Sequence, residues 1–197
     1  SAPAHAHSGA PGHHEPYVPV FTDGSARLTE LQDIISRYPD KRAALLPALW
    51  MVQQERGWIS EDAMREVGDR LGCTAAYVKG VVTFYTMYHQ HPVGKHFIQV
   101  CTTSPCLCAG ADDVVKAFLE HTGCKELGLT SPDGKYTVIE VECLGACDRA
   151  PVVMVNNEHW HEKASPESCS KLVDDLKARG ISALSGCHLH VEGANAK

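Results

Sequence analysis

Two closely spaced cysteine pairs constrain the fold of this chain more than any other feature of its sequence. Cys101 and Cys106 are separated by four residues, and Cys143 and Cys147 are separated by three. Thiols this close together can bind the same metal centre, and two such pairs from separate loops can converge as four ligands. We therefore interpret the rest of the sequence as a scaffold that brings the two loops together.

Each cysteine pair follows a run of residues that favours a β-strand. Residues 96–100 lead up to Cys101, and residues 136–141 end just before Cys143. Sites in open α/β sheets are normally built at the carboxyl ends of the strands. If the two strands are neighbours, their loops present four thiolates, which suit either tetrahedral zinc or a [2Fe–2S] cluster. Spacing alone favours iron–sulfur without excluding zinc.

The composition is that of an ordinary globular protein and excludes several classes of function. Hydrophobic residues make up 44% and charged residues 21% of the 197 positions. The net charge of −6 argues against a nucleic-acid partner, which requires clustered Lys and Arg. No apolar run is long enough to cross a bilayer, and the N-terminus lacks a secretory pattern, so we expect a cytoplasmic protein. Nine cysteines, an odd number, do not suggest a secreted disulfide framework.

Residues 28–92 are predicted to form a small bundle of four helices. Apolar residues recur there at helical spacing, and capping residues separate the helical runs. Pro47 lies inside the second run and should kink or shift that helix. The large aromatic side chains of the segment are interpreted as packing groups rather than as ligand contacts. These side chains belong to Trp50, Trp58, Phe84 and Tyr85.

The pattern changes in the second half of the chain. Residues 93–180 are predicted to form an α/β layer in the order β-α-β-β-β-α, with one helix over residues 110–121 and the last helix starting at Ser165. Residues 1–27 are rich in His and poor in large apolar residues, so we expect a disordered or extended arm. Residues 181–197 are expected to form a weakly patterned tail.

The sequence contains further distinctive segments, both around the two cysteine pairs and before them. The segments in question are Gln54–Ser60, Gly80–Tyr85, Cys101–Cys106 with Gly110, Glu142–Cys147 and Ala150–Val153. Together they resemble the family of E subunits of NADH:quinone oxidoreductase, the thioredoxin-like [2Fe–2S] ferredoxins of respiratory complex I. The match keeps one register over residues 28–180. It implies an α/β, thioredoxin-like [2Fe–2S] ferredoxin domain preceded by a small helical bundle.

By this resemblance, Cys101 and Cys106 would bind one iron of a single [2Fe–2S] cluster, and Cys143 and Cys147 would bind the other. No catalytic residue is expected, because the cluster itself carries the electron. The sequence departs from the family at Cys108, where a leucine is usual. We interpret Cys108 as a small buried hydrophobe, with a role as substitute ligand as the alternative. The other cysteines are interpreted as structural or incidental: Cys73, Cys124, Cys169 and Cys187.

The resemblance also implies a function and partners. The chain would be an electron-transfer component of the oxidoreductase, exchanging one electron with the FMN of a partner flavoprotein that binds NADH. It would assemble with other peripheral-arm subunits of complex I at the inner face of the membrane, without entering the bilayer. The same module occurs in NAD-reducing hydrogenases and NAD-dependent formate dehydrogenases. The chain has no GxGxxG fingerprint and no Walker loop, so we do not expect it to bind NADH or FMN alone.

Two further hypotheses use the same residues. A structural zinc module with an interaction role would need the same four cysteines, and metal analysis would distinguish it from the cluster. A thioredoxin-like thiol oxidoreductase is disfavoured, because the sequence contains no C-x-x-C.

Overall fold

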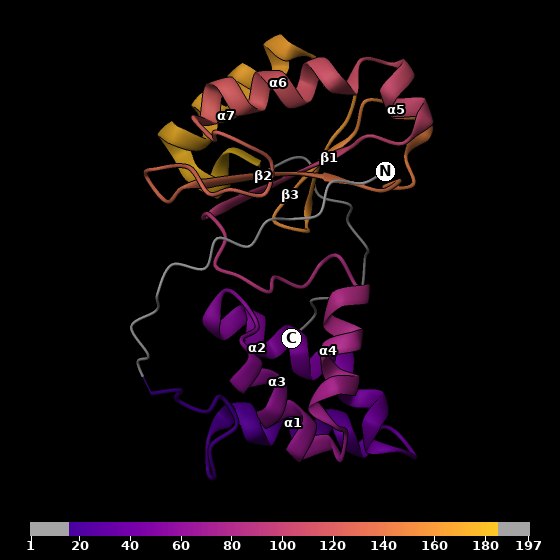
Figure 1. Ribbon diagram of the computed structural model, residues 1–197, viewed down its shortest axis with the longest axis vertical. Coiled ribbons are helices and arrows are strands. Elements are labelled where there is room, and N and C mark those ends of the chain that lie inside the picture. The colour runs from indigo at the N-terminus through magenta and orange to yellow at the C-terminus, as the bar shows by residue number, and fades with distance from the viewer. Residues whose placement is uncertain (1–15, 185–197) are drawn as a thin grey trace.

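A computed structural model describes residues 16–184, apart from the side chain of Ala183. Its first half is helical and its second half is built on a sheet (Figure 1). The helical half consists of α1 (Ala26–Ser36), a 3₁₀ turn η1 (Lys41–Ala44), α2 (Leu45–Arg56), α3 (Glu61–Leu71) and α4 (Ala75–Phe84). Within the described residues, no helix is both long and apolar enough to cross a membrane.

The helices begin and end where the capping residues predict. The side chains of Ser25, Ser60 and Thr74 each accept a hydrogen bond from a backbone N–H in the first turn of α1, α3 and α4. Each of these bonds satisfies a donor that has no partner within its own helix. Gly57 and Gly72 end α2 and α3 in the left-handed conformation, which glycine adopts without steric cost. The predicted helical bundle is therefore confirmed.

Pro47 shifts its helix instead of kinking it. The Asp40 side chain caps the short 3₁₀ turn by accepting from the backbone N–H of Arg42, and α2 starts only at Leu45. Pro47 then lies in the first turn of α2, where a backbone N–H has no partner within the helix. Pro47 therefore does not kink α2, because the helix begins late enough to place the proline in its first turn.

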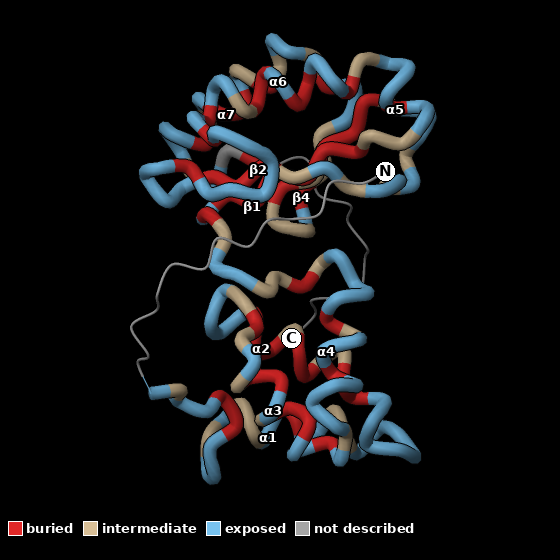
Figure 2. The backbone as a smooth tube through the Cα atoms, in the orientation of Figure 1, coloured by how far each residue is buried: buried red, intermediate tan, exposed pale blue. Residues whose placement is uncertain are grey.

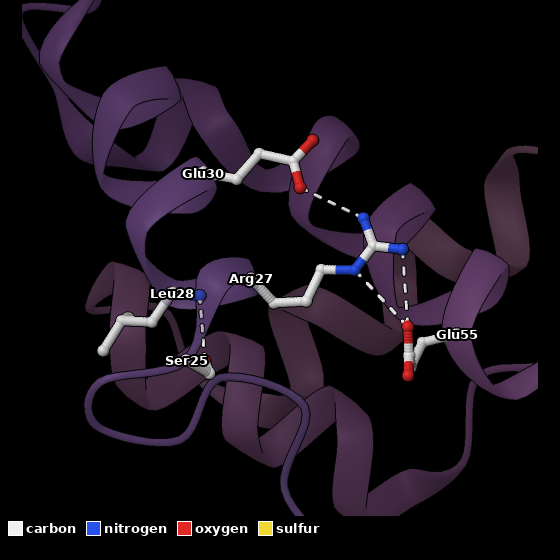
Figure 3. A network of polar contacts seen from close by, with 5 residues as sticks. All are labelled: Ser25, Arg27, Leu28, Glu30 and Glu55. Carbon is white, nitrogen blue, oxygen red and sulfur yellow. Dashed lines mark hydrogen bonds and ion pairs between the residues drawn. The ribbon is translucent and has the colours of Figure 1, made fainter.

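A polar contact between helices supports the packing of α1 on α2 (Figure 3). The guanidinium of Arg27 donates to Glu30 in its own helix at 3.0 Å and to Glu55 in α2 at 3.4 Å. These groups are partly solvent-exposed, so each pair contributes at most about 1 kcal/mol. The packing therefore depends mainly on the apolar residues beneath.

The segment before α1 is extended but held against the helices. The carboxylate of Glu66 in α3 accepts hydrogen bonds from the Tyr17 hydroxyl and from the backbone N–H groups of Val20 and Phe21. Val20 and Phe21 are buried in the helical core. The predicted arm therefore contains an anchored part, and its residues 1–15 lie outside the described residues. No local pattern predicts this anchor, because one distant carboxylate holds three separate donors.

The second half contains a four-stranded sheet with helices on one face (Figure 1). Its elements are β1 (His96–Cys101), α5 (Ser104–Cys108), α6 (Ala111–Thr122), β2 (Tyr136–Val141), a 3₁₀ turn η2 (Cys147–Arg149), β3 (Val153–Val155), β4 (His159–His161), α7 (Pro166–Arg179) and a 3₁₀ turn η3 (Gly180–Leu184). The strand order is β2-β1-β3-β4, with β1 parallel to β2 and antiparallel to β3. The predicted element order is confirmed, with α5 as an addition.

The β3–β4 hairpin closes one edge of the sheet. Asn156 and Asn157 lie in its turn with positive φ angles of 56° and 61°, a conformation that asparagine tolerates, and Glu158 completes the three-residue loop between the paired residues Val155 and His159. The Asn156 side chain accepts from the backbone N–H of Phe97 at 2.7 Å, which ties the turn to β1. The turn thereby fixes the hairpin beside the central strand.

Two hydrophobic cores form, one in each half (Figure 2). The helical core is drawn from residues 20–88, and the sheet core from residues 98–184, where α6 and α7 cover the sheet. Leu184 belongs to the sheet core, so the start of the predicted tail is packed, whereas residues 185–197 lie outside the described residues. Since the two cores share no residue, we propose separate domains at residues 28–92 and 93–180.

The two halves meet through the segment that precedes β1. Gln53 in α2 is buried, donates to the carbonyl of Met87 at 2.9 Å and accepts from the backbone N–H of His89 at 2.7 Å. The ring of His89 packs edge-on against Phe97 of β1, with centroids 4.3 Å apart. Asn157 of the hairpin also donates to the Met87 carbonyl, at 3.4 Å. The linker is therefore bonded to both halves.

The interpretation of the aromatic residues is wrong for the end of α4. Phe84 is 76% exposed and Tyr85 is 38% exposed, and their rings contact each other edge-on at a centroid distance of 5.0 Å. Trp50 and Trp58 are half-buried, and Trp50 packs against the helical core as predicted. Helical periodicity could not identify Phe84 as exposed, because α4 is apolar on more than one face.

We expect Glu66→Ala to lower the free energy of unfolding by about 2 kcal/mol, because it removes the acceptor of three hydrogen bonds, two of them from backbone groups. Asp69→Ala on the same helix is the matched control and should change stability by less than about 0.5 kcal/mol. Urea denaturation of both variants measures the difference. Equal stabilities would show that the anchor contributes nothing.

We expect stability to fall as the pH decreases from 6.5 towards 4, in part through His89. Burial lowers the pKa of His89 from 6.5 to about 4, so within this window the unfolded chain binds a proton that the folded chain excludes. The contribution is at most about 1.4 kcal/mol per pH unit. His89→Gln should reduce the loss of stability between pH 7 and 5, whereas His121→Gln, at an exposed position, should not. An unchanged pH dependence in His89→Gln would contradict this assignment.

Candidate metal centre

The parallel pairing of β1 with β2 brings the two cysteine loops to the same edge of the sheet. The register runs from His96 opposite Tyr136 to Cys101 opposite Val141, so both strands end together. Cys101 is the last residue of β1, and Cys143 follows β2 by two residues. The prediction that the strands are neighbours and that their loops lie side by side is confirmed.

The first loop contains a short helix that the sequence pattern does not predict. α5 (Ser104–Cys108) begins between the two cysteines of the pair and contains the second of them, Cys106, which is 1% exposed. Pro105 lies in its first turn, where proline is favoured. The position of Pro105 was the one sequence signal for this helix. A helix of five residues is too short to show a hydrophobic periodicity.

Cys108 is solvent-exposed, so the interpretation of this residue as a buried hydrophobe is wrong. The short helix accounts for the difference. Cys106 and Cys108 are two residues apart in α5, and residues two apart on a helix do not share a face. Burial of Cys106 therefore turns Cys108 towards solvent.

The second loop places its two thiols side by side at the surface. The Sγ atoms of Cys143 and Cys147 are 3.4 Å apart, and both residues are exposed. Gly145 between them has a φ of +85°, a value that side-chain-bearing residues rarely adopt. In this conformation the Gly145 N–H points at Cys143 Sγ, at 3.4 Å.

Several hydrogen-bond donors converge on the sulfurs of the first pair. Burial acts to raise the pKa of Cys101, but the hydroxyl and N–H of Thr103 and the N–H of Leu144 outweigh it, and the pKa is lowered. Burial raises the pKa of Cys106, against the N–H of Val152, which favours the thiolate. Leu144 and Val152 both follow β2 in the chain. Backbone donors from the segment after β2 therefore act on the sulfurs of the first cysteine loop.

The second pair shows the same division. The pKa of Cys143 is lowered, mainly by the hydrogen bond from the Gly145 N–H and secondly by the hydrogen bond with the Cys147 thiol. The bond to Cys143 in turn raises the pKa of Cys147. Each pair thus combines one thiol with a lowered pKa and one with a raised pKa, which is the expected behaviour of two acids that share a site.

A small apolar cluster surrounds the first cysteine pair and is distinct from the main sheet core. It consists of the buried residues Cys101, Cys106, Ala111 and Val152, with partly buried Leu144, Ala146, Ala150 and Trp160 around them. The backbone N–H of Cys101 donates to the Val152 carbonyl at 3.0 Å, and the Ala150–Pro151 peptide is cis. The loop before β3 therefore lies beside the first cysteine pair, together with the two cysteine loops.

Charged groups near the second loop lie in solvent. Asp148 and Arg149 form an ion pair at 3.3 Å, and Arg149 also approaches Glu162 at 3.7 Å. These side chains are largely exposed, so the pairs contribute little to stability. The structure fits a solvated ion pair of Asp148 and Arg149 better than a charged group that moderates the negative charge of the site.

The donor set consists of two pairs of thiols at one edge of the sheet. A [2Fe–2S] cluster takes two cysteines at each iron. The two pairs, with N–H groups directed at their sulfurs, therefore fit an iron–sulfur cluster.

The remaining cysteines of the described region do not join the site. Cys169 in α7 is fully buried in the sheet core, where burial raises its pKa to about 12. Cys124 is also buried and donates to the Tyr136 carbonyl at 3.5 Å. Cys73 packs beside the helical core, and Cys187 lies outside the described residues. The interpretation of Cys73, Cys124 and Cys169 as structural cysteines agrees with these positions.

The fold and the site together define a class: an α/β protein with two thiol pairs gathered at one edge of its sheet and equipped to bind metal. The sequence profile of the thioredoxin-like [2Fe–2S] ferredoxins matches residues 31–177. The chain belongs to the thioredoxin-like [2Fe–2S] ferredoxin family. Family membership confirms both the predicted fold and the predicted cofactor, one [2Fe–2S] cluster.

Similar proteins agree with this assignment. The chain is 41% identical over 160 residues to the E subunit of the NADH-quinone oxidoreductase of Rickettsia bellii, with 80% of this chain and 95% of that protein covered. It is 43% identical over 157 residues to the protein of the same name from Mycobacterium tuberculosis, with 79% and 62% covered. The chain thus spans less than two thirds of the mycobacterial protein.

A solved structure shows the same fold. An NAD⁺-reducing [NiFe]-hydrogenase in the H2-reduced state matches with a TM-score of 0.59 at 19% identity, over 69% of this chain and 22% of the hydrogenase chain. At this level of identity the similarity concerns the fold alone.

Proposed function

We propose that the four cysteines at the sheet edge are the ligands of the cluster. Cys101 and Cys106 would bind one iron, and Cys143 and Cys147 the other. The single observation that carries this proposal is the convergence of two thiol pairs at the ends of paired parallel strands. Cys108 points to solvent and is not included among the ligands.

When bound, a [2Fe–2S] cluster supplies one-electron redox chemistry. The protein's part is to hold the sulfurs and to offset their negative charge. The N–H groups of Thr103, Leu144, Gly145 and Val152 favour the thiolate form of the cysteines they contact. No residue of the chain is assigned to acid–base or nucleophilic catalysis.

We further propose that the chain is an electron-transfer component of a complex I type NADH:quinone oxidoreductase. It would exchange one electron with the FMN of a partner flavoprotein that binds NADH, within a peripheral arm at the inner face of the membrane. The names of its relatives support this role. The exposure of Cys143 and Cys147 supports it as well, because a partner can approach the cluster from that side.

An NAD-reducing hydrogenase or an NAD-dependent formate dehydrogenase would use the same module. The match to the hydrogenase concerns the fold, whereas the sequence relatives are components of NADH-quinone oxidoreductases, so we favour the latter. Isolation of the complex from the native source would distinguish these assemblies. A quinone-reducing complex with an FMN-binding partner supports the proposal, and a hydrogenase or formate dehydrogenase in its place overturns it.

The purified chain itself tests the ligand assignment. It should be brown, contain iron and sulfide in equal amounts sufficient for one cluster, and give a rhombic paramagnetic signal after reduction. A colourless chain with one zinc ion would instead support the structural zinc module.

Substitution of single cysteines gives the sharpest prediction. Cys143→Ser should remove the cluster or shift its paramagnetic spectrum, because an iron loses a thiolate. Cys108→Ser is the matched control on the first loop and should leave iron content and spectrum unchanged, because its side chain faces solvent. Loss of the signal in Cys108→Ser would require a revised assignment of Cys106.

A further inference from the structure

Thr103 occupies a capping position but does not cap its helix. It precedes α5, where a threonine side chain normally accepts a hydrogen bond from the second or third N–H of the helix. The second helical residue here is Pro105, which has no N–H, and the Thr103 side chain makes no cap bond. The Thr103 carbonyl alone starts the helix, by accepting from Leu107 at 2.9 Å.

The hydroxyl of Thr103 is directed at the cysteine site instead. Its Oγ1 lies 3.2 Å from Cys101 Sγ. It also contributes to the lowered pKa of Cys143, after the Gly145 N–H and the Cys147 thiol. The contact that carries a distance is the one with the first pair, and the single hydroxyl proton can be donated to one sulfur at a time.

The hydroxyl differs in kind from the other donors at the site. The donors of Leu144, Gly145 and Val152 are backbone N–H groups, which no substitution removes without changing the chain's course. In the contact between Thr103 Oγ1 and Cys101 Sγ either atom can donate, but a sulfur bound to iron has no proton, so the Thr103 hydroxyl is then the donor. Its donor can be deleted by exchange for valine, which has nearly the same shape.

We propose that the Thr103 hydroxyl tunes the reduction potential of the cluster by donating a hydrogen bond to a ligand sulfur, which rests on the proposed assignment of the four cysteines. Reduction adds one electron, supplied by the flavin partner, and therefore one negative charge to the sulfur-rich centre. No bond is formed or broken, and the hydroxyl keeps its proton. A donor to sulfur stabilises the more negative state more strongly, and so raises the potential.

The test is the midpoint potential of the full chain carrying its cluster, measured by redox titration of the paramagnetic signal. Thr103→Val should lower the equilibrium constant for reduction about tenfold, which is ~59 mV for a one-electron couple. Thr103→Ser keeps the hydroxyl and should stay close to the wild-type potential. Thr102→Val is the matched control, since the described contacts of Thr102 are a backbone bond to Val141.

The outcomes separate this inference from the function it rests on. If the wild-type chain holds no [2Fe–2S] cluster, the ligand proposal fails. If clusters are present and the potentials of Thr103→Val and wild type agree, or if Thr102→Val shifts equally, the tuning role is overturned. Should Thr103→Val fail to hold a cluster, Thr103→Ala compared with Thr103→Ser decides. Loss of the cluster in Thr103→Ala as well would assign the residue to assembly and overturn tuning.

Discussion

The parallel pairing of β1 with β2 is the constraint on which the rest of the structure depends. Parallel strands that end in register deliver both cysteine loops to one edge, from segments far apart along the chain. Ile98 and Val100 on β1 and Val138 on β2 are buried in the core beneath α6 and α7, so a slip of one residue would move these side chains to the opposite face of the sheet. The same slip would also separate the thiol pairs. Fold stability and site geometry are therefore determined by one set of interactions.

The features that the sequence predicts well are those set by local chemistry. Serine and threonine caps, glycines after helices and the Asn156–Asn157 turn each satisfy backbone groups within a few residues, so their effect can be recognised without the fold. The four candidate ligands could also be named from the sequence, because they form two closely spaced pairs that each follow a strand-like run. Their convergence followed from the strands that precede them.

The features that the sequence could not predict depend on contacts between distant residues or on very short elements. The anchoring of residues 17–21 requires Glu66, more than forty residues away along the chain. The exposure of Cys108 follows from α5, whose five residues carry no periodic signal. The exposure of Phe84 could not be predicted because α4 is apolar on more than one face, and packing decides which of these faces is buried. In each case the tertiary structure decided what the local pattern left open.

The closeness of Cys143 and Cys147 has a consequence for the chain before iron arrives. Two exposed thiols 3.4 Å apart, one of which has a lowered pKa, are open to oxidation to a disulfide. The buried Cys106, whose pKa is raised, is protected by comparison. Under the proposed ligand assignment, iron would have a second effect besides redox chemistry: it would occupy the thiols that oxidants reach first, and the chain without iron would be the chemically vulnerable form.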